Sequence, residues 1–514
     1  DTKYKKMSSK VLSATTLGLT SHLVEVEADT HPGMYVFSIV GLPDATIKES
    51  KDRVNAAIKN CGFKPPHMCG HVTVNLAPAD IQKVGPLYDL PIALGFLLAT
   101  KQIDFDTSGK LFVGELSLDG KIRPVNGVLP IAMMAKEKNI GEIFVPRQNA
   151  SEAGIVKGLR VVPVEDFKNL VAHLLGEKKI DPHPEQDLQK IFDTQSFHFD
   201  MAHVKGQEHA KRALEIAAAG AHNVLFSGPP GSGKTLLAKT FPSIMPPLTF
   251  PEALEITKIF SIAGKLPREV ALVSERPFRS PPHSASAVSL VGGGQFPRPG
   301  EISLAHRGVL FLDEFPEFSR MVLENLRQPL EDGTISVARA QATLSFPARF
   351  TLIAAMNPCP CGNATDPEKL CACSPSNIIR YQRKISGPIL DRIDIHIEVP
   401  RLKFDKLASE KMGESSASIR ERVIAARERQ QERFKNMDGV IANSEMSSQQ
   451  MKQFCQLGEK ELELLRKAVN QLQLSARAYH RIIKIARTIA DLVGSENIEM
   501  PHLAEAIQYR QRQV

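Results

Sequence analysis

Residues 223–235 read NVLFSGPPGSGKT, and this stretch decides how the chain folds. Its last eight residues fit the pattern GxxxxGK[ST], directly after an apolar run typical of a buried strand and directly before a run with helical spacing. Such a loop wraps phosphate oxygens with backbone N–H groups, while its lysine reaches the β- and γ-phosphates and its hydroxyl binds Mg²⁺. The sequence therefore predicts a nucleotide-phosphate loop, with a purely structural glycine-rich turn as the alternative. Its residues are Gly228, Pro229, Pro230, Gly231, Ser232, Gly233, Lys234 and Thr235, of which Thr235 is the expected Mg²⁺ ligand.

A second apolar run, GVLFLDE at residues 308–314, ends in two carboxylates. We expect Asp313 to hold Mg²⁺ through water and Glu314 to polarise the attacking water. The alternative is a buried strand followed by a solvated acidic turn. Asn357 ends a third apolar run and is placed to orient the same water, unless it only forms a turn.

Length and composition indicate a folded, multidomain chain. Its 514 residues are too many for one hydrophobic core, and a size of about 150 residues per domain predicts about three domains. The 64 basic and 57 acidic residues give a net charge of +7, which permits a polyanionic partner without requiring one. Neither a membrane span nor a secretory signal is apparent, so we expect a cytoplasmic protein.

The pattern of runs divides the chain into four segments. Residues 8–176 mix strand-like and helical runs and predict an α+β or α/β domain, and residues 177–199 are polar and read as a linker. Residues 200–400 carry the phosphate loop together with short apolar strands, including TISVA at 334–338, which suits a parallel sheet flanked by helices. Residues 401–514 turn strongly helical and predict a helical lid.

Four long stretches lie between residues 276 and 400: RPFRSPPHSASAVSLVGGG (276–294), PGEISLAHRGVLFLDEFPEF (299–318), RQPLEDGTISVARAQATLSFPARFTLIAAMNPCPCG (327–362) and SGPILDRIDIHIEVP (386–400). They resemble the magnesium-chelatase-like AAA+ ATPases of the YifB/ComM family. The chain also resembles the MCM helicases, which carry an insert before the acidic strand and a β-hairpin before the Asn. The resemblance implies ATP and Mg²⁺ as cofactors and a homohexameric ring.

Two arginines take their expected roles from the resemblance. Arg392, in LDRID, corresponds to the arginine finger of the MCM helicases, which completes the site of the neighbouring subunit; the alternative is a surface ion pair with Asp391 or Asp394. Arg477, in LSARAYHR, matches the second-sensor arginine of the lid. It shares one helical face with Arg481 and Lys484, and a merely solvated basic face is the alternative.

The amino domain is similar to the same family at residues 40–60, 72–81 and 112–130, and it also resembles the proteolytic domain of Lon-type proteases. The protease pattern places its serine where this chain has Leu87, and its catalytic lysine falls near Leu129. Neither side chain acts as a nucleophile or base. We expect a non-catalytic copy used for assembly or partner contact, with a displaced serine as the alternative.

Four of the seven cysteines form two C-x-C pairs, Cys359 with Cys361 and Cys371 with Cys373, separated by nine residues. Residues i and i+2 of an extended segment point to one side, so each pair presents two thiolates to a tetrahedral Zn²⁺. The spacing predicts a structural zinc site, with four reduced thiols as the alternative.

Candidate nucleic-acid contacts lie in two places. Thr334–Phe346 reads as a β-hairpin with Arg339 near its tip. The Pro- and Gly-rich insert upstream carries Arg279 and Arg298, together with Arg276 and His283. These side chains are expected to contact phosphates, the main source of sequence-independent DNA affinity; a basic insert that holds subunits together is the alternative.

The combined expectation is a multidomain α/β ATPase that forms a homohexamer around single-stranded, duplex or branched DNA. The resemblance implies branch migration during recombination in natural transformation, with recombination proteins as further partners. The main alternative is a magnesium-chelatase-type subunit that remodels a protein partner in porphyrin metallation. The Lon-like amino domain speaks against it, since the chelatase motor subunit lacks that domain.

Overall fold

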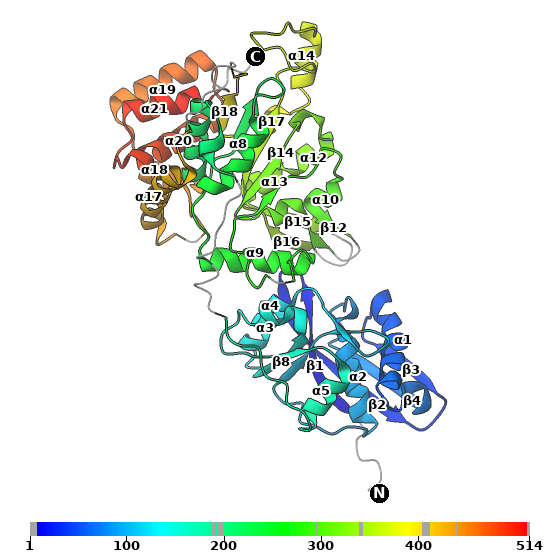
Figure 1. The fold of residues 1–514 in the computed structure, drawn as a ribbon. Helices are drawn as coiled ribbons and strands as arrows, with labels where there is room; N and C mark the ends of the chain where they lie inside the picture. Colours follow the sequence, from blue (N-terminus) through cyan, green and yellow to red (C-terminus); the bar gives the residue numbers. More distant parts are fainter. Residues whose placement is uncertain are drawn as a thin grey trace. The chain divides into compact units, whose positions relative to one another are not determined.

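The computed structural model describes residues 8–186, 192, 199–268, 270–294, 297–338, 343–402, 412–437 and 439–510 (Figure 1). Its contacts divide the chain into two compact units. The first comprises residues 1–194, 250–274 and 295–298, and the second comprises residues 195–249, 275–294 and 299–514. Each unit has its own hydrophobic core.

The first unit is built on a seven-stranded mixed sheet with the order β3-β4-β2-β1-β5-β8-β9. Strands β1 and β2 pair antiparallel along their whole length, from Ser9 opposite Ala28 to Leu17 opposite Thr20. Alternate side chains of β4 are buried, as expected for a strand with one face on the core. The strands are β1 (Ser9–Leu17), β2 (Thr20–His31), β3 (Val36–Val40), β4 (His71–Ala77), β5 (Lys110–Phe112), β8 (Glu142–Pro146) and β9 (Arg160–Val164), with a short ribbon of β6 (Glu115–Leu116) and β7 (Ile122–Arg123).

The helices of this unit agree with the mixture of strand-like and helical runs expected for residues 8–176. They are α1 (Ala45–Asn60), α2 (Asp89–Ala99), α3 (Val128–Glu137), α4 (Ala150–Ala153) and α5 (Phe167–Leu174). Helix α1 begins at Asp44, whose carboxylate accepts the N–H of Ile47 at 2.8 Å, an ordinary N-terminal cap. The helix α2 is buried almost all round, so its near-continuous apolar sequence does not expose an apolar face.

One helix of the first unit comes from the middle of the chain. Helix α9 (Phe250–Ala263) falls in the segment 250–274 and packs against α3. The hydroxyl of Ser261 donates to the carboxylate of Glu152, and its carbonyl accepts the N–H of Gly127 at 3.3 Å. The two units are therefore not continuous segments of sequence, because residues 250–274 belong to the first unit while the residues on either side of them belong to the second.

The second unit contains a five-stranded sheet with the order β11-β14-β17-β10-β18, in which all neighbours run parallel. Strands β10, β14 and β17 are buried at every residue, which explains why they read as continuous apolar runs rather than alternating ones. Their bounds are β10 (Val224–Ser227), β11 (Phe278–Arg279), β14 (Val309–Leu312), β17 (Thr351–Met356) and β18 (Ile395–Glu398).

The strand TISVA does not belong to this sheet, and our expectation for it there was wrong. Residues Thr334–Ala338 form β15, which pairs antiparallel with β16 (Thr343–Pro347) in a separate two-stranded ribbon. Only one face of the ribbon is buried, through Ile335, Val337 and Phe346. The antiparallel strand pairing predicted for the hairpin over Thr334–Phe346 is confirmed, while its tip with Arg339 lies outside the described residues.

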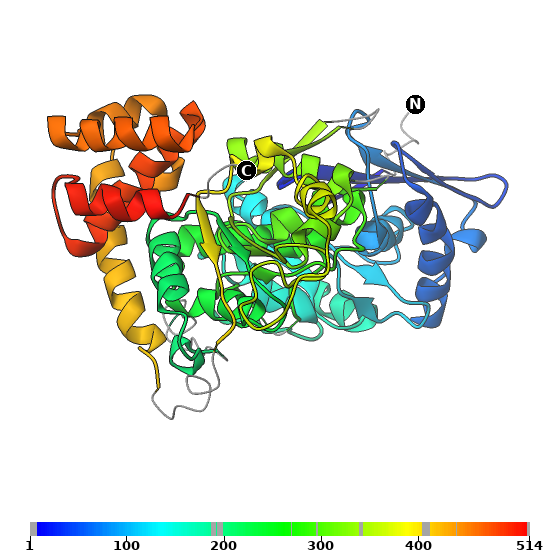
Figure 2. The same cartoon turned by 90° about the horizontal axis from the view of Figure 1, so that it is seen from above.

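Apart from α9, the helices between residues 208 and 390 are α7 (Glu208–Gly220), α8 (Lys234–Thr240), α10 (Ala287–Val291), α11 (Glu301–Leu304), α12 (Arg320–Asn325), α13 (Arg327–Asp332), α14 (Pro375–Gln382) and α15 (Gly387–Leu390). The two-residue strands β12 (Gly292–Gly293) and β13 (Arg298–Pro299) lie in the same range. The carboxyl-terminal helices are α17 (Ser416–Phe434), α18 (Ser448–Phe454), α19 (Glu459–Leu472), α20 (Ala476–Val493) and α21 (Met500–Gln508). They form the orange and red group in Figure 2 and confirm the helical reading of this region.

Helix α20 shows why the lid folds as it does. Its apolar stripe of Ile482, Ile485 and Ile489 is buried against the rest of the lid and α7. Its polar side presents Arg477 and Arg481 instead, as the 3.6-residue period predicts. No helix among the described residues is long and apolar enough to cross a membrane.

Candidate nucleotide site

The predicted phosphate loop lies between β10 and α8, at the carboxyl end of the sheet. Gly231 and Gly233 adopt positive φ angles of 76° and 93°, a backbone that L side chains rarely take. Gly228 is required for a different reason: a Cβ there would lie 2.2 Å from the carbonyl oxygen of Val399, which follows β18. The glycines of the pattern thus fix both the curvature of the loop and its close approach to the sheet.

Lys234, the first residue of α8, points back into the loop. Its ammonium group donates to the carbonyl oxygens of Gly228 at 2.7 Å and Pro229 at 2.9 Å. It also donates to the side-chain oxygen of Asn357 at 3.3 Å. Burial lowers the pKa of Lys234 below its ordinary value, so a phosphate anion that binds here would stabilise its charged form.

The acidic pair meets the loop through a hydroxyl. The Thr235 hydroxyl donates to the carboxylate of Asp313 at 2.9 Å, so the two expected Mg²⁺ ligands are in contact. Asp313 follows directly on β14, and its carboxylate also accepts the N–H of Glu314 at 2.9 Å. Glu314 has φ 51° and ψ 45°, a left-handed conformation uncommon for a residue with a side chain. The backbone therefore turns out of the strand direction at Glu314.

His283, which the sequence led us to expect as a contact to DNA phosphates, lies next to Glu314. Its Nδ1 lies 3.1 Å from Oε2 of Glu314, and both side chains are about half exposed. His283 follows β11, the strand next to β14, so the parallel sheet brings the two residues to the same edge. This contact depends on β11 lying next to β14, and the order of strands in the sheet cannot be read from the sequence.

The structure thus brings together Lys234, Thr235, Asp313 and Asn357 through contacts between side chains, with Glu314 adjacent. Strand β17 lies between β14 and β10; Asp313 follows β14, Asn357 follows β17, and the phosphate loop that leads to Lys234 follows β10. The arrangement places an ammonium, a hydroxyl and carboxylates around one loop, a set suited to a nucleotide phosphate with its metal ion.

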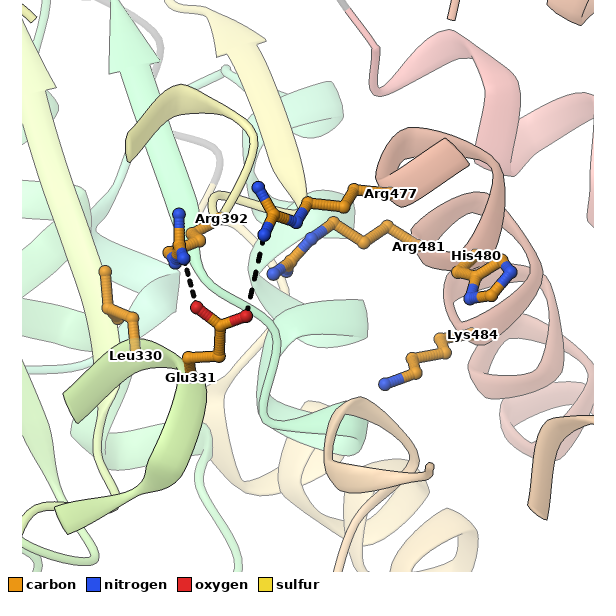
Figure 3. Close-up of a pocket in the computed structure, with 7 residues that line it drawn as sticks. All are labelled: Leu330, Glu331, Arg392, Arg477, His480, Arg481 and Lys484. Carbon is orange, nitrogen blue, oxygen red and sulfur yellow. Dashed lines mark hydrogen bonds and ion pairs between the residues drawn. The ribbon is translucent and has the colours of Figure 1, made fainter. Parts of the chain in front are cut away.

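A second cluster gathers basic side chains around one carboxylate in a pocket of about 170 Å³ (Figure 3). Glu331, on α13, accepts a hydrogen bond from Arg392 and lies 3.6 Å from the guanidinium of Arg477. The hydrogen bond from Arg392 lowers the pKa of Glu331. Arg481 and Lys484 also extend from α20 toward this pocket in Figure 3.

The side chain of Arg392 is almost fully buried, with 9% of its surface exposed. It donates to the carbonyl oxygen of Pro388 at 2.7 Å as well as to Glu331. The ion pair with Asp391 or Asp394 that we considered is therefore replaced by one with Glu331.

Asp394 anchors the lid to the sheet beneath this pocket. It is buried, accepts a hydrogen bond from Arg481 and accepts the N–H of Asn223 at 2.9 Å. Burial opposes ionisation of Asp394, but the charge of Arg481 and the contact with His222 hold its pKa well below the ordinary value. Arg481 is thus already paired within the chain, whereas Arg477 retains 54% of its side-chain surface.

The four cysteines of the two C-x-C pairs converge. Their sulfur atoms all lie within 4.8 Å of one another, with Cys359 buried and the other three partly exposed. Sγ of Cys359 lies 3.4 Å from that of Cys361 and 3.7 Å from that of Cys371. Backbone N–H groups of Asn363 and Ala372 lower the pKa of Cys361 to about 6, so one thiolate is stabilised before any cation binds.

The residues expected to contact nucleic acid have different surroundings in the structure. Arg279 donates to both oxygens of Glu301, at 2.6 and 2.8 Å, which engages its guanidinium within the chain. Arg276 donates to the carbonyl oxygens of Pro246 and Arg307, a structural role. Arg298 is exposed, and Arg339 lies outside the described residues.

In the first unit, the two positions that correspond to a protease nucleophile and base are both in the core. Leu87 is 6% exposed and Leu129 is fully buried. Their apolar side chains pack in the core and present no reactive group at these two positions.

A parallel sheet in the order found here, a phosphate loop after β10, an acidic pair after β14 on the far side of β17, and a helical lid define an AAA+ protein. Three family models agree. Residues 200–407 match the model described as magnesium chelatase, subunit ChlI, residues 413–510 match its carboxyl-terminal domain, and residues 26–149 match a model described as subunit ChlI of Mg-chelatase.

The chain belongs to the YifB/ComM family of magnesium-chelatase-like AAA+ proteins. It is 46% identical to competence protein ComM of Haemophilus influenzae, with 97% of both chains covered. It is 42% identical to a YifB protein of Escherichia coli, with 98% of this chain and 97% of the relative covered. A weaker similarity links it to Lon protease 2 of Bacillus subtilis, 27% identical over 142 residues, or 27% of this chain and 24% of the relative.

Proposed function

We propose that the protein is an ATP-driven, homohexameric DNA motor that promotes branch migration during recombination in natural transformation. The observation that carries this proposal is the end-to-end match with a competence protein, at 46% identity over 97% of both chains. The geometry supports the ATPase step. In this proposal Lys234 holds the triphosphate, Thr235 and Asp313 hold Mg²⁺, and Glu314 accepts the proton of the attacking water, which Asn357 orients.

The second cluster supports the proposed ring. Arg392 and Arg477 converge on a single carboxylate, and no hydrogen bond among the described residues joins them to the phosphate loop of their own chain. In the proposed hexamer these guanidinium groups face the γ-phosphate bound to the neighbouring subunit. A phosphate would then replace Glu331 as the counter-ion, because both present oxygen atoms to the same two groups.

If Glu331 competes with phosphate for Arg392 and Arg477, the Glu331→Gln variant should assemble at lower ATP concentration than the wild type. Removing the charge weakens the internal ion pair while keeping the size of the side chain. Sedimentation against ATP concentration measures the change, which we expect to be about 1.5-fold to fivefold for a partly exposed pair. Asp332→Asn is the matched control, because Asp332 is an exposed carboxylate in the same helix. Weaker assembly of Glu331→Gln would show that the pair organises the pocket for phosphate instead.

Arg298 and Arg339 are the proposed contacts to DNA phosphates. Replacing either by Ala should leave basal ATP hydrolysis and ring formation intact, and DNA-stimulated hydrolysis should fall. The log–log slope of DNA binding against salt should flatten by about one unit for each phosphate that is no longer neutralised. Fluorescence anisotropy with labelled DNA at several salt concentrations measures the slope. An unchanged slope in both variants, with full stimulation, would remove these residues from the DNA interface.

The alternative activity is remodelling of a protein partner in porphyrin metallation. The description of the model matching residues 26–149 names a chelatase subunit, so the amino domain alone does not separate the two functions. The ATPase rate, measured with single-stranded, duplex and branched DNA at two salt concentrations, does separate them. Stimulation by DNA with a steep salt dependence supports the motor, and stimulation only by a protein partner supports the alternative.

We also propose that the four-cysteine cluster holds a structural Zn²⁺. With a Zn–S distance of about 2.3 Å, the sulfur atoms of a tetrahedral Cys₄ site lie about 3.8 Å apart. The separations of 3.4, 3.6 and 3.7 Å found here fit that geometry. Bound Zn²⁺ would supply the cross-link that holds residues 359–373 together, and it takes no part in hydrolysis.

A further inference from the structure

We infer that the cysteine loop, residues 358–373, is a clamp that holds the phosphate loop in its nucleotide-binding shape. The inference rests on the zinc site and the nucleotide site proposed above. It assigns to the cysteine loop a role in ATP affinity, which goes beyond the structural role proposed for its zinc site. Two separate contacts and one covalent connection carry it.

The direct contact is between Gly362 and Pro230. Gly362 follows the first C-x-C pair, and a Cβ built on it would lie 2.5 Å from Cδ and 2.7 Å from Cγ of Pro230. The backbone of the cysteine loop therefore lies against the pyrrolidine ring of the phosphate loop. Because proline has few conformations of its own, a shift of Gly362 toward it would move the phosphate-loop backbone.

The second contact runs through the strand end after β18. Arg401 lies 3.4 Å from the carboxylate of Asp366 and 3.7 Å from that of Glu368, both in the cysteine loop. Asp366 retains only 1% of its side-chain surface, so this ion pair is held in place. The carbonyl of Pro400, the residue before Arg401, accepts a hydrogen bond from Gln207 at 2.7 Å.

Gln207 completes this second route. Its side-chain amide also donates to the carbonyl oxygen of Ser232, in the phosphate loop, at 3.3 Å. One amide therefore joins the strand end that holds the cysteine loop to the loop that binds phosphate. Gln207 adopts φ 57°, a value uncommon for a residue with a side chain. Its two hydrogen bonds help to hold it in this conformation.

The covalent connection is the shortest. Asn357, which contacts Lys234, is followed by Pro358 and then by the buried Cys359. The carbonyl of Pro358 also accepts a hydrogen bond from Gln382 of α14 at 3.2 Å. Metal binding at Cys359 would therefore fix the end of β17 two residues from the side chain that meets the phosphate-loop lysine.

The variant Gly362→Ala tests the direct contact without removing a cysteine. We expect it to retain one Zn²⁺ per chain and to bind a fluorescent ATP analogue about 10- to 100-fold more weakly, because forcing a methyl group into filled space has effects of about that size. The control is Gly62→Ala: Gly62 has a similar φ of 89°, against 82° at Gly362, but no atom within 4 Å of a built Cβ. It reproduces the backbone strain without the contact.

A double-mutant cycle separates contact from local strain. In a Pro230→Ala background the ring atoms that the new methyl group would meet are absent, so the loss of affinity caused by Gly362→Ala should shrink at least threefold. Residues in contact commonly deviate from additivity, and a double-mutant cycle resolves a threefold deviation. An equal loss in both backgrounds would show that Gly362→Ala acts only inside the cysteine loop and would overturn the clamp.

The metal is tested with Cys371→Ser/Cys373→Ser, against Cys61→Ser/Cys69→Ser in the first unit as control. The protein is purified with Zn²⁺ alone, its zinc content is measured by mass spectrometry, and binding of the ATP analogue is measured without DNA. We expect the first variant to lose its zinc and to bind nucleotide at least tenfold more weakly, with a normal circular dichroism spectrum. Loss of zinc with unchanged nucleotide affinity, or no zinc in the wild type, would overturn the inference. Because no DNA is present, the DNA-motor proposal is unaffected by either result.

Discussion

Replacing Glu314 by Gln is expected to lower kcat for ATP hydrolysis by about 10²- to 10⁴-fold, the usual contribution of a general base. Binding of ATP should remain, because Lys234, Thr235 and Asp313 keep their contacts. Gln has the size of Glu, so the turn at this left-handed residue and the contact with His283 are preserved. The loss should therefore appear in kcat and not in the affinity for ATP.

Steady-state hydrolysis and equilibrium binding of a fluorescent ATP analogue, measured on the same preparation, separate the two effects. Glu317→Gln is the matched control. Glu317 is a neighbouring carboxylate, 43% exposed, whose partner is Lys384 at 2.9 Å. Near-normal turnover of Glu314→Gln would remove Glu314 from the role of base, and an equal loss in the control would point to a general effect of charge.

The second large effect is expected at Arg392. An arginine supplied to a phosphoryl-transfer site contributes about 10³- to 10⁵-fold to kcat where it has been measured, so Arg392→Ala alone should be nearly inactive. Lys234→Ala should be inactive for a different reason, because it loses the group that reaches the phosphates. If Arg392 acts on the neighbouring subunit, a mixed ring contains some interfaces with both residues intact.

Titrating one variant into the other therefore should restore ATPase activity, with a maximum near equal amounts. Arg380→Ala serves as control for the loss of a guanidinium, since Arg380 is exposed and donates to Asn377 in its own helix turn. No recovery at any ratio, with mixed rings demonstrated by differential labelling, would assign Arg392 to its own subunit or to stability. A role for Arg392 in stability is the competing explanation, because its side chain is buried against Glu331 of its own chain.

Sequence pattern predicted the parts of the site that depend on local spacing. The phosphate loop, the acidic pair and Asn357 each follow an apolar run, and parallel strands bring their carboxyl ends to one edge of a sheet. The two C-x-C pairs were predicted to present their thiolates to one cation, and their sulfur atoms do converge, although Cys359 and Cys361 lie in a turn and not in an extended segment. The lid helix α20 followed from its 3.6-residue period.

What the sequence missed depends on strand order and on long-range contacts. The pairing of His283 with Glu314 requires β11 to lie next to β14, and the convergence of Arg392 and Arg477 on Glu331 joins three distant segments. TISVA was misplaced because a half-buried hairpin strand and a core strand have similar apolar composition. Arg279 shows the same limit for charge, since only the structure reveals that Glu301 already binds it.

The central claim, that ATP hydrolysis drives the movement of DNA, is tested most directly by branch migration on a labelled, partly homologous three-strand junction. The wild-type protein with ATP and Mg²⁺ should convert the junction to its displaced products, while Lys234→Ala and Glu314→Gln should not, although both bind the junction. Conversion that depends on ATP in the wild type and disappears in both variants is the predicted result. No ATP-dependent conversion of any branched substrate, by a protein that hydrolyses ATP and forms rings, would contradict the account.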